Sequence, residues 1–125
     1  MTPRQLLTQV LQATLPADVD IIAYSHNIDA PSTSTVMVRF DKANPSPVAG
    51  MGARLYEFTL IGIAAKTTAG PADDELDKLL EDVLYAISKA DNGITWTEAR
   101  RGAYGEPDPT NPAFEVTCPV TFIIS

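Results

Sequence analysis

The sequence contains one cysteine, Cys118, and one histidine, His26, among its 125 residues. Since a single cysteine cannot form an intrachain disulfide, we expect a fold without oxidative cross-links that forms inside the cell. No apolar run approaches the roughly 18 residues that a membrane span needs. Thr8, Gln9 and Gln12 interrupt the apolar positions that a signal peptide would keep. These absences predict a protein that works in the cytoplasm, or in something assembled there.

Basic residues are also scarce, because 9 Lys and Arg stand against 16 Asp and Glu, for a formal net charge of −7. A module that grips phosphates needs clustered Lys and Arg, so the composition argues against such a module. It remains compatible with a protein that lets nucleic acid pass without holding it. A hydrophobic content of 45% and a charged content of 20% are typical of a globular chain. We expect one domain, residues 1–125, around one core.

Few side chains offer catalytic chemistry. Ser25 precedes His26, but adjacency in sequence does not place a nucleophile near a base, and nothing marks a third member of a triad. We expect an exposed turn histidine. Cys118 falls on the apolar face of a strand, which favours a buried, unreactive thiol. Gly50 and Gly52 precede a strand and lack the strand–turn–helix setting of a phosphate loop. The sequence therefore predicts no catalytic residue, no cofactor and no metal ligand.

The segment Gly70–Asn92 predicts one long amphipathic helix. Its apolar residues recur at the helical period: Leu76, Leu79, Leu80, Val83, Leu84 and Ile87. Pro71 suits the first helical position, and Asp73–Glu75 suit the first turn, near the positive end of the helix dipole. Gly93 is placed for a left-handed C-terminal cap. Leu80, in the middle of the apolar stripe, is expected in the core.

The polar side of this helix carries several carboxylates. Lys78 lies four residues from both Asp74 and Asp82, a spacing that brings side chains together on a helix surface. We therefore expect a solvated, ion-paired face, and not a cation site.

A shorter helix is predicted at the start of the chain. Thr2 and Gln5 have the spacing of a capping box, and Pro3 suits the first helical position. The apolar stripe that follows consists of Leu6, Leu7, Val10 and Leu11, with Leu15 as a further candidate. Pro16 ends the helix, which is short enough to need packing for stability.

Five segments read as strands: Val19–Ser25, Thr35–Phe40, Arg54–Ala65, Ile94–Tyr104 and Phe114–Ile124. The resulting order, α-β-β-β-α-β-β, predicts an α+β fold with a single mostly antiparallel mixed sheet, covered by one long helix and a short N-terminal helix. We expect Trp96 beneath the long helix, with a partner-binding anchor as the alternative. We also expect a bulge or bend at Gly102, and an edge position or bulge at Pro119.

The segment Asp41–Gly52 has no periodicity, and its two prolines and two glycines predict a mobile loop. The strand Arg54–Ala65 is apolar on both faces, and the short first helix would cover only part of the second face. A curled sheet or another subunit would then cover the rest, so we expect an oligomer. The candidate partner or subunit contacts are Asp41, Lys42, Asn44, Val48, Met51, Arg100 and Arg101. For the adjacent Arg100 and Arg101, which alternation sends to opposite faces, surface ion pairs are the simpler expectation.

A family resemblance rests on seven segments in order: TPRQLLTQVLQATLP, VMVRF, DKANPSPVAGMG, YEFTLIGIA, DELDKLLEDVLYAI, ITWTEA and VTCPVTFII. With these, the chain resembles the tail terminator proteins of long-tailed (siphovirus-type) bacteriophages, the family of the lambda tail terminator. The resemblance implies a structural virion protein of the tail or neck, assembled in the host cytoplasm, with no enzymatic activity and no cofactor. It implies a ring, typically a hexamer, that caps the tail tube and stops its growth.

The partners that the resemblance implies are further copies of the chain, the major tail tube protein and a head connector or completion protein. DNA would pass through the bore without specific binding, and no membrane is involved. Two alternatives stay open: another neck or head–tail completion protein, and a small dimeric α+β enzyme or ligand-binding protein. The mass in solution separates a ring from a compact dimer.

Overall fold

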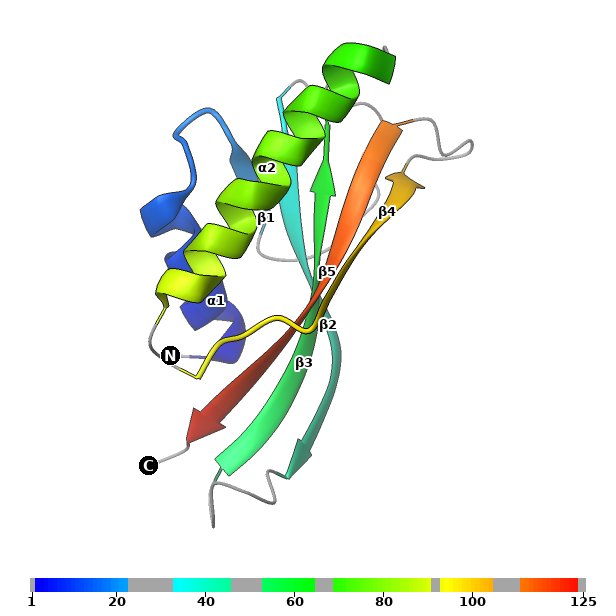
Figure 1. Ribbon diagram of the computed structural model, residues 1–125. Helices are drawn as coiled ribbons and strands as arrows, with labels where there is room; N and C mark the ends of the chain where they lie inside the picture. The colour runs from blue at the N-terminus through cyan, green and yellow to red at the C-terminus, as the bar shows by residue number, and fades with distance from the viewer. Residues whose placement is uncertain are drawn as a thin grey trace.

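Two helices lie against a five-stranded sheet in the computed structural model, which describes residues 2–22, 33–45, 53–64, 69–90, 93–104 and 111–123 (Figure 1). The elements are α1 (Pro3–Thr14), β1 (Asp20–Ile22), β2 (Thr35–Pro45), β3 (Ala53–Ile63), α2 (Ala69–Lys89), β4 (Glu98–Tyr104) and β5 (Asn111–Ile123). The strand order is β1-β2-β3-β5-β4, with β1 parallel to β2 and every other pair antiparallel. The predicted α+β class and element order are confirmed.

The start of α1 is fixed by the predicted capping box. The Gln5 amide donates to Thr2 Oγ1 at 3.1 Å, and the Thr2 amide donates to Gln5 Oε1 at 2.8 Å. The two bonds satisfy donors that a helix N-terminus otherwise leaves unpaired. Leu7 and Leu11 are fully buried, and Leu15 forms the C-cap.

Helix α2 begins earlier than predicted, at Ala69, so Asp73–Glu75 lie beyond its first turn. The helix ends at Lys89, and Gly93 has a left-handed φ of 76° four residues later. Gly93 therefore does not cap the helix. Its left-handed backbone lies where the chain begins to pair with β5. The buried face of α2 consists of Leu76, Leu79, Val83, Ala86 and Ile87. Leu80 is only partly buried, so its predicted place in the core is wrong.

The sheet separates two buried clusters. The larger one joins Leu7 and Leu11 of α1 to residues of α2 and to one face of β2, β3 and β5. Phe114 belongs to it and lies so close over Gly62 that a Cβ there would stand 2.2 Å from its ring. The smaller cluster on the other face is Met37, Ile61, Ile63 and Ala113.

The two apolar faces predicted for β3 are thus confirmed, but the expectation that α1 covers part of the second face is wrong. Both helices contribute to the larger cluster and contact each other, so they share one face of the sheet (Figure 1). A short connection takes α1 directly into the edge strand β1, which holds it beside α2.

Strand β2 runs five residues past its predicted end, because Asp41–Pro45 continue the pairing with β3. The predicted loop over Asp41–Gly52 is therefore wrong for these five residues, and residues 46–52 lie outside the described part. The ladder shifts register between Phe40 and Lys42, which makes Asp41 a bulge residue. A bulge reverses the alternation of side chains, so a regular two-residue period could not reveal this part of the strand.

The predicted bulge at Gly102 is wrong, since Gly102 pairs with Ala113 in an unbroken register. An extra residue lies earlier, because Ile94 pairs with Val120 while Glu98 pairs with Thr117. This irregular stretch leads from α2 to β4.

Pro119 lies in β5, which is an interior strand, so the predicted edge position is wrong. The Thr95 amide donates to the Pro119 carbonyl at 3.1 Å, which places the backbone of Pro119 toward the irregular stretch before β4. The N–H that proline lacks is therefore missing where the ladder is already irregular. In the same stretch Trp96 is 38% exposed and outside both clusters, so its predicted packing beneath α2 is wrong.

Candidate functional site

The sheet extends past the ends of both helices (Figure 1). Within the described residues, β1 pairs with β2 only as far as Met37, and the regular β4 ladder begins opposite Thr117. The irregular stretch 93–97 stays hydrogen-bonded to β5 as far as Thr121. Past this stretch and past the end of β1, the sheet narrows to β2, β3 and β5, which form a three-stranded end. On the side of the helices it carries Phe40, Tyr56 and Phe122, which we call the aromatic tip.

The aromatic tip is a packed cluster with an exposed edge. The Phe40 ring centroid lies 6.3 Å from that of Tyr56 and 5.7 Å from that of buried Phe58, and Tyr56 meets Phe122 edge-on at 6.2 Å. These separations are typical of favourable aromatic pairs. Phe40 is nevertheless 45% exposed. A large apolar side chain held in a cluster at the surface is typical of an interaction site.

Two arginines flank the aromatic tip. The Arg4 guanidinium lies 5.8 Å from the Phe58 ring centroid and donates to the Val38 carbonyl at 2.9 Å. Arg54 is exposed and forms no ion pair within the described residues. Beside it lies a hollow at the end of the β2–β3 pair, lined by Ala43, Asn44, Pro45, Ala53, Arg54 and Tyr56.

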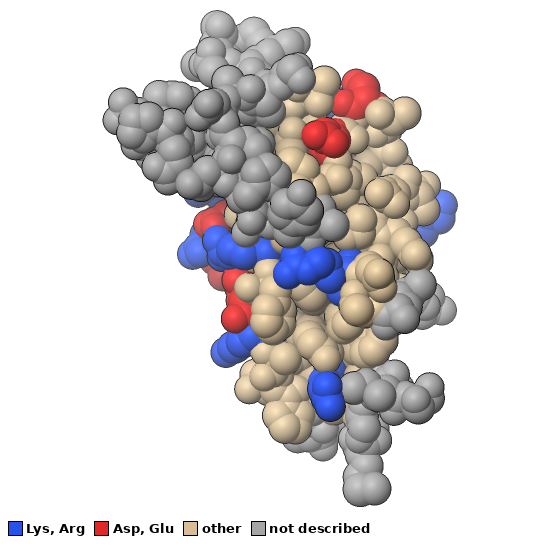
Figure 2. All heavy atoms as spheres, turned by 180° about the vertical axis from the view of Figure 1, so that it is seen from behind, with Lys and Arg blue, Asp and Glu red and all other residues tan. Residues whose placement is uncertain are grey.

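The opposite, helix-free face carries a chain of ion pairs that includes several predicted contact residues. Arg39 pairs with Asp41 at 3.0 Å and with Glu115 at 3.5 Å, and Arg100 reaches the same Glu115 at 3.3 Å. Thr59 donates to Asp41 as well. Basic and acidic side chains accordingly meet in a band across the side of the molecule seen in Figure 2. Exposed ion pairs contribute about 0–1 kcal/mol each to the free energy of unfolding. The main effect of this band is therefore to neutralise charge on the surface.

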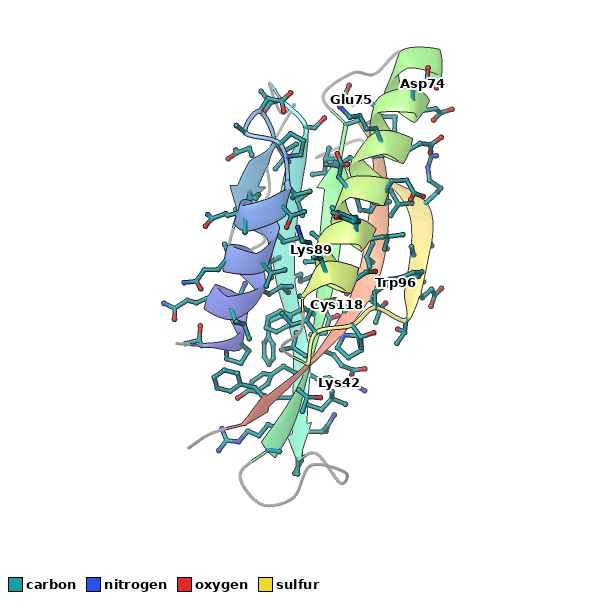
Figure 3. The ribbon with its side chains drawn as sticks, turned by 60° about the vertical axis from the view of Figure 1, so that its left-hand side comes forward. Lys42, Asp74, Glu75, Lys89, Trp96 and Cys118 are labelled. Atoms are coloured by element: carbon teal, nitrogen blue, oxygen red, sulfur yellow. The ribbon has the colours of Figure 1, made fainter. Side chains whose placement is uncertain are left out.

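The remaining predicted contacts are distributed over three places. Lys42 pairs with Glu57 at 3.1 Å, in the part of the sheet beyond the helices (Figure 3). Asn44 is exposed and lines the hollow. Val48 and Met51 lie outside the described residues. The structure thus brings Asp41 and Arg100 into one network and leaves Asn44 on the neighbouring edge of the sheet.

Arg101 points away from Arg100, as alternation predicted, and reaches α2. It pairs with Asp73 at 2.5 Å and with Asp77 at 3.4 Å. Lys78, for which we predicted pairs with Asp74 and Asp82, forms no ion pair in the described part of the chain. The acidic side of α2 is therefore ion-paired as expected, but by a neighbouring strand and not within the helix.

The surface of α2 that faces away from the sheet remains acidic. Its exposed residues in the described part of the helix, which we call the outer face of α2, are Asp73, Asp74, Asp77, Lys78, Glu81, Tyr85, Ser88 and Lys89. Asp74 lies toward the end of α2 that is remote from Lys42 and the three-stranded end (Figure 3). Tyr85 is 60% exposed, with the Lys89 ammonium 5.8 Å from its ring centroid.

The described residues offer few candidates for a catalytic or metal-binding site. Burial raises the pKa of the Cys118 thiol to about 12, so it stays protonated and unreactive at neutral pH, as predicted. His26 lies outside the described residues. Among those described, no group of three or more His, Cys, Asp or Glu side chains could hold a metal ion. None of the described helices is long and apolar enough to cross a membrane.

The aromatic tip was missed in the sequence, although a signal for it exists. Phe40, Tyr56 and Phe122 fall on the apolar faces of predicted strands, and such faces are usually covered. The 11 residues of β3 span about 36 Å, whereas the 12 residues of α1 span about 18 Å. The first helix therefore cannot cover the whole strand, although α2, with 21 residues and about 32 Å, lies on the same face.

The fold is shared with a solved structure, the sheath/tube terminator of an extracellular contractile injection system (PVC) in its extended state, determined by cryo-electron microscopy. The match covers 99% of this chain with a TM-score of 0.54 and 13% sequence identity. This chain spans 58% of the length of that terminator. No family model matches the sequence, and no curated protein matches it. The structural similarity therefore establishes a fold that a tube terminator also uses.

Proposed function

We propose that this chain is a tail terminator: a structural subunit, without enzymatic activity, that caps the end of a tail tube and stops its growth. The observation that carries the proposal is the similarity to a sheath/tube terminator over 99% of the chain. The order of the sequence segments resembles the same kind of protein in long-tailed bacteriophages. We infer that the subunits form a ring, a hexamer as in that family, on the major tail tube protein, within the virion tail or neck.

The surfaces of the subunit support an assembly role. Three surfaces of different character are available to neighbouring subunits or partners. They are the aromatic tip, the ion-paired helix-free face and the acidic outer face of α2. A tail terminator needs at least three kinds of contact, with its own copies, with the tube and with a head connector or completion protein. The contacts predicted at Asp41, Lys42, Asn44, Arg100 and Arg101 remain part of this proposal, as do Val48 and Met51.

Passage of DNA through the bore is consistent with the charge distribution. Each phosphate that a Lys or Arg neutralises adds a salt-dependent contribution to binding. On the helix-free face Arg39, Lys42 and Arg100 are each paired with a carboxylate. Such a surface has little net attraction for a polyanion.

The test has two arms. The purified protein is analysed by native mass spectrometry, where a ring of about six chains of 13.4 kDa supports the proposal and a monomer or compact dimer contradicts it. Particles are then assembled without the protein and viewed by electron microscopy. Tubes of uncontrolled length, which leave heads without tails, are the expected result. Tubes of normal length that fail to join heads would instead indicate another neck or head–tail completion protein.

A further inference from the structure

The aromatic tip and the outer face of α2 have complementary character. The tip combines three rings with Arg54, which forms no ion pair among the described residues. On and beside the outer face, five carboxylates stand against three cations: Asp73, Asp74, Asp77, Glu81 and the partly buried Asp82 against Lys78, Lys89 and Arg101. Tyr85 adds an exposed ring to the same surface. One surface is therefore aromatic and basic, and the other is acidic with one aromatic side chain.

The two surfaces cannot meet within one chain. The aromatic tip lies on the part of the sheet beyond the ends of the helices, whereas the outer face of α2 points away from the sheet (Figure 1). A contact between them requires two molecules. Because the contact joins two different surfaces, it is heterologous, and repetition of a heterologous contact generates a ring when the rotation closes.

We propose that the aromatic tip of one copy docks on the outer face of α2 of a second copy of this chain. The inference rests on the ring proposed above and assigns its subunit contact. Phe40 and Tyr56 supply the apolar centre of the contact, opposite Tyr85. Arg54 supplies the cation opposite Glu81. Aromatic residues and arginine are the side chains most enriched at the energetic centres of protein interfaces.

The test uses two variants, each defective in one surface. The tip variant carries Phe40→Ser and Arg54→Glu, and the helix variant carries Glu81→Gln and Tyr85→Ser. All four side chains are exposed, so each variant should keep the circular dichroism spectrum of the parent protein. The tip variant should unfold at a somewhat lower temperature, because Phe40 also packs against Tyr56 and Phe58. Each variant alone should lose the ring and give a single chain of 13.4 kDa by native mass spectrometry.

A mixture of the two variants distinguishes this contact from others. The helix variant keeps an intact tip and the tip variant keeps an intact outer face, so one productive contact can form between them. The expected product is a discrete pair of one copy of each, with no larger ring. The control is Trp96→Ser, because Trp96 is exposed but lies on neither surface. This variant should still assemble into the oligomeric ring.

The outcomes separate the two proposals. A ring that survives in either double variant, or a mixture that stays monomeric, overturns the assignment of the contact and leaves the ring intact as a proposal. A parent protein that is itself monomeric overturns both.

Discussion

Gly62 shows how one residue can fix the packing of a whole face of the sheet. It lies opposite Phe114 in the β3–β5 ladder, and the Phe114 ring occupies the space above its Cα. Phe114 is fully buried, so the ring has little room to move. The absence of a side chain at Gly62 therefore allows a large ring to fill the core between the sheet and α2.

Gly62→Ala should destabilise the protein, because the new Cβ would stand 2.2 Å from the Phe114 ring. We expect a loss of about 1–3 kcal/mol, the usual range for overpacking a core. The matched control is Gly102→Ala, where no atom lies within 4 Å of the added Cβ. Urea unfolding of both variants tests this, and equal midpoints would contradict the packing described for Phe114.

Cys118 makes a pH-dependent contribution to stability. Burial raises its pKa from 9.0 to about 12, so above pH 9 the unfolded chain loses the thiol proton while the folded chain keeps it. The unfolded state then binds fewer protons, and the free energy of unfolding falls as pH rises between 9 and 12. The slope attributable to this thiol is at most about 1.4 kcal/mol per pH unit.

Comparison with Cys118→Ala isolates the effect, since alanine has no titrating group. The variant should be less stable at pH 7, but its stability should fall less steeply between pH 9 and 11 in urea titrations. Identical slopes for the two proteins would show that the thiol is not desolvated as described.

At the scale of the element, α2 is stabilised by its buried face. Leu79 is 3% exposed, whereas Leu80 is only partly buried against the same cluster. Leu79→Ala should therefore cost about 2–5 kcal/mol, and Leu80→Ala should cost less. Glu81→Ala, on the exposed side, should change stability by about 0.5 kcal/mol or less. A larger effect at position 80 than at position 79 in denaturant titrations would mean that the helix is rotated from this orientation.

The elements also show what local sequence can and cannot predict. The capping box at Thr2 and Gln5 was predictable because all its partners lie within one turn. The continuation of β2 past Phe40 was not, since the bulge at Asp41 removes the alternation that identifies a strand. A helix's apolar stripe shows that it packs on something, but not on which face of a sheet. Tertiary contacts determine the face of the sheet on which α1 packs. They therefore also determine that the aromatic tip stays exposed.

For the whole molecule, the balance of 16 acidic and 9 basic residues predicts weak attraction to DNA. The protein should not retard duplex DNA in a gel at moderate salt. The variant Glu57→Gln, Glu115→Gln removes two carboxylates that pair with Lys42, Arg39 and Arg100. Because these cations would then be less neutralised, we expect weak retardation at low salt that is lost as salt rises. Retardation by the parent protein at moderate salt would argue against a surface that DNA passes freely.

The strand order of the sheet has a consequence for synthesis on the ribosome. Strand β3 pairs with β2, which directly precedes it in the chain. Its other neighbour, β5, leaves the ribosome only after α2 and β4. Phe58 and Leu60 lack their opposite residues, Cys118 and Val116, until that last strand is translated. A nascent or prematurely terminated chain therefore leaves one side of its central strand unpaired and cannot complete the subunit. Only a chain translated through β5 can present every surface that an assembly would need.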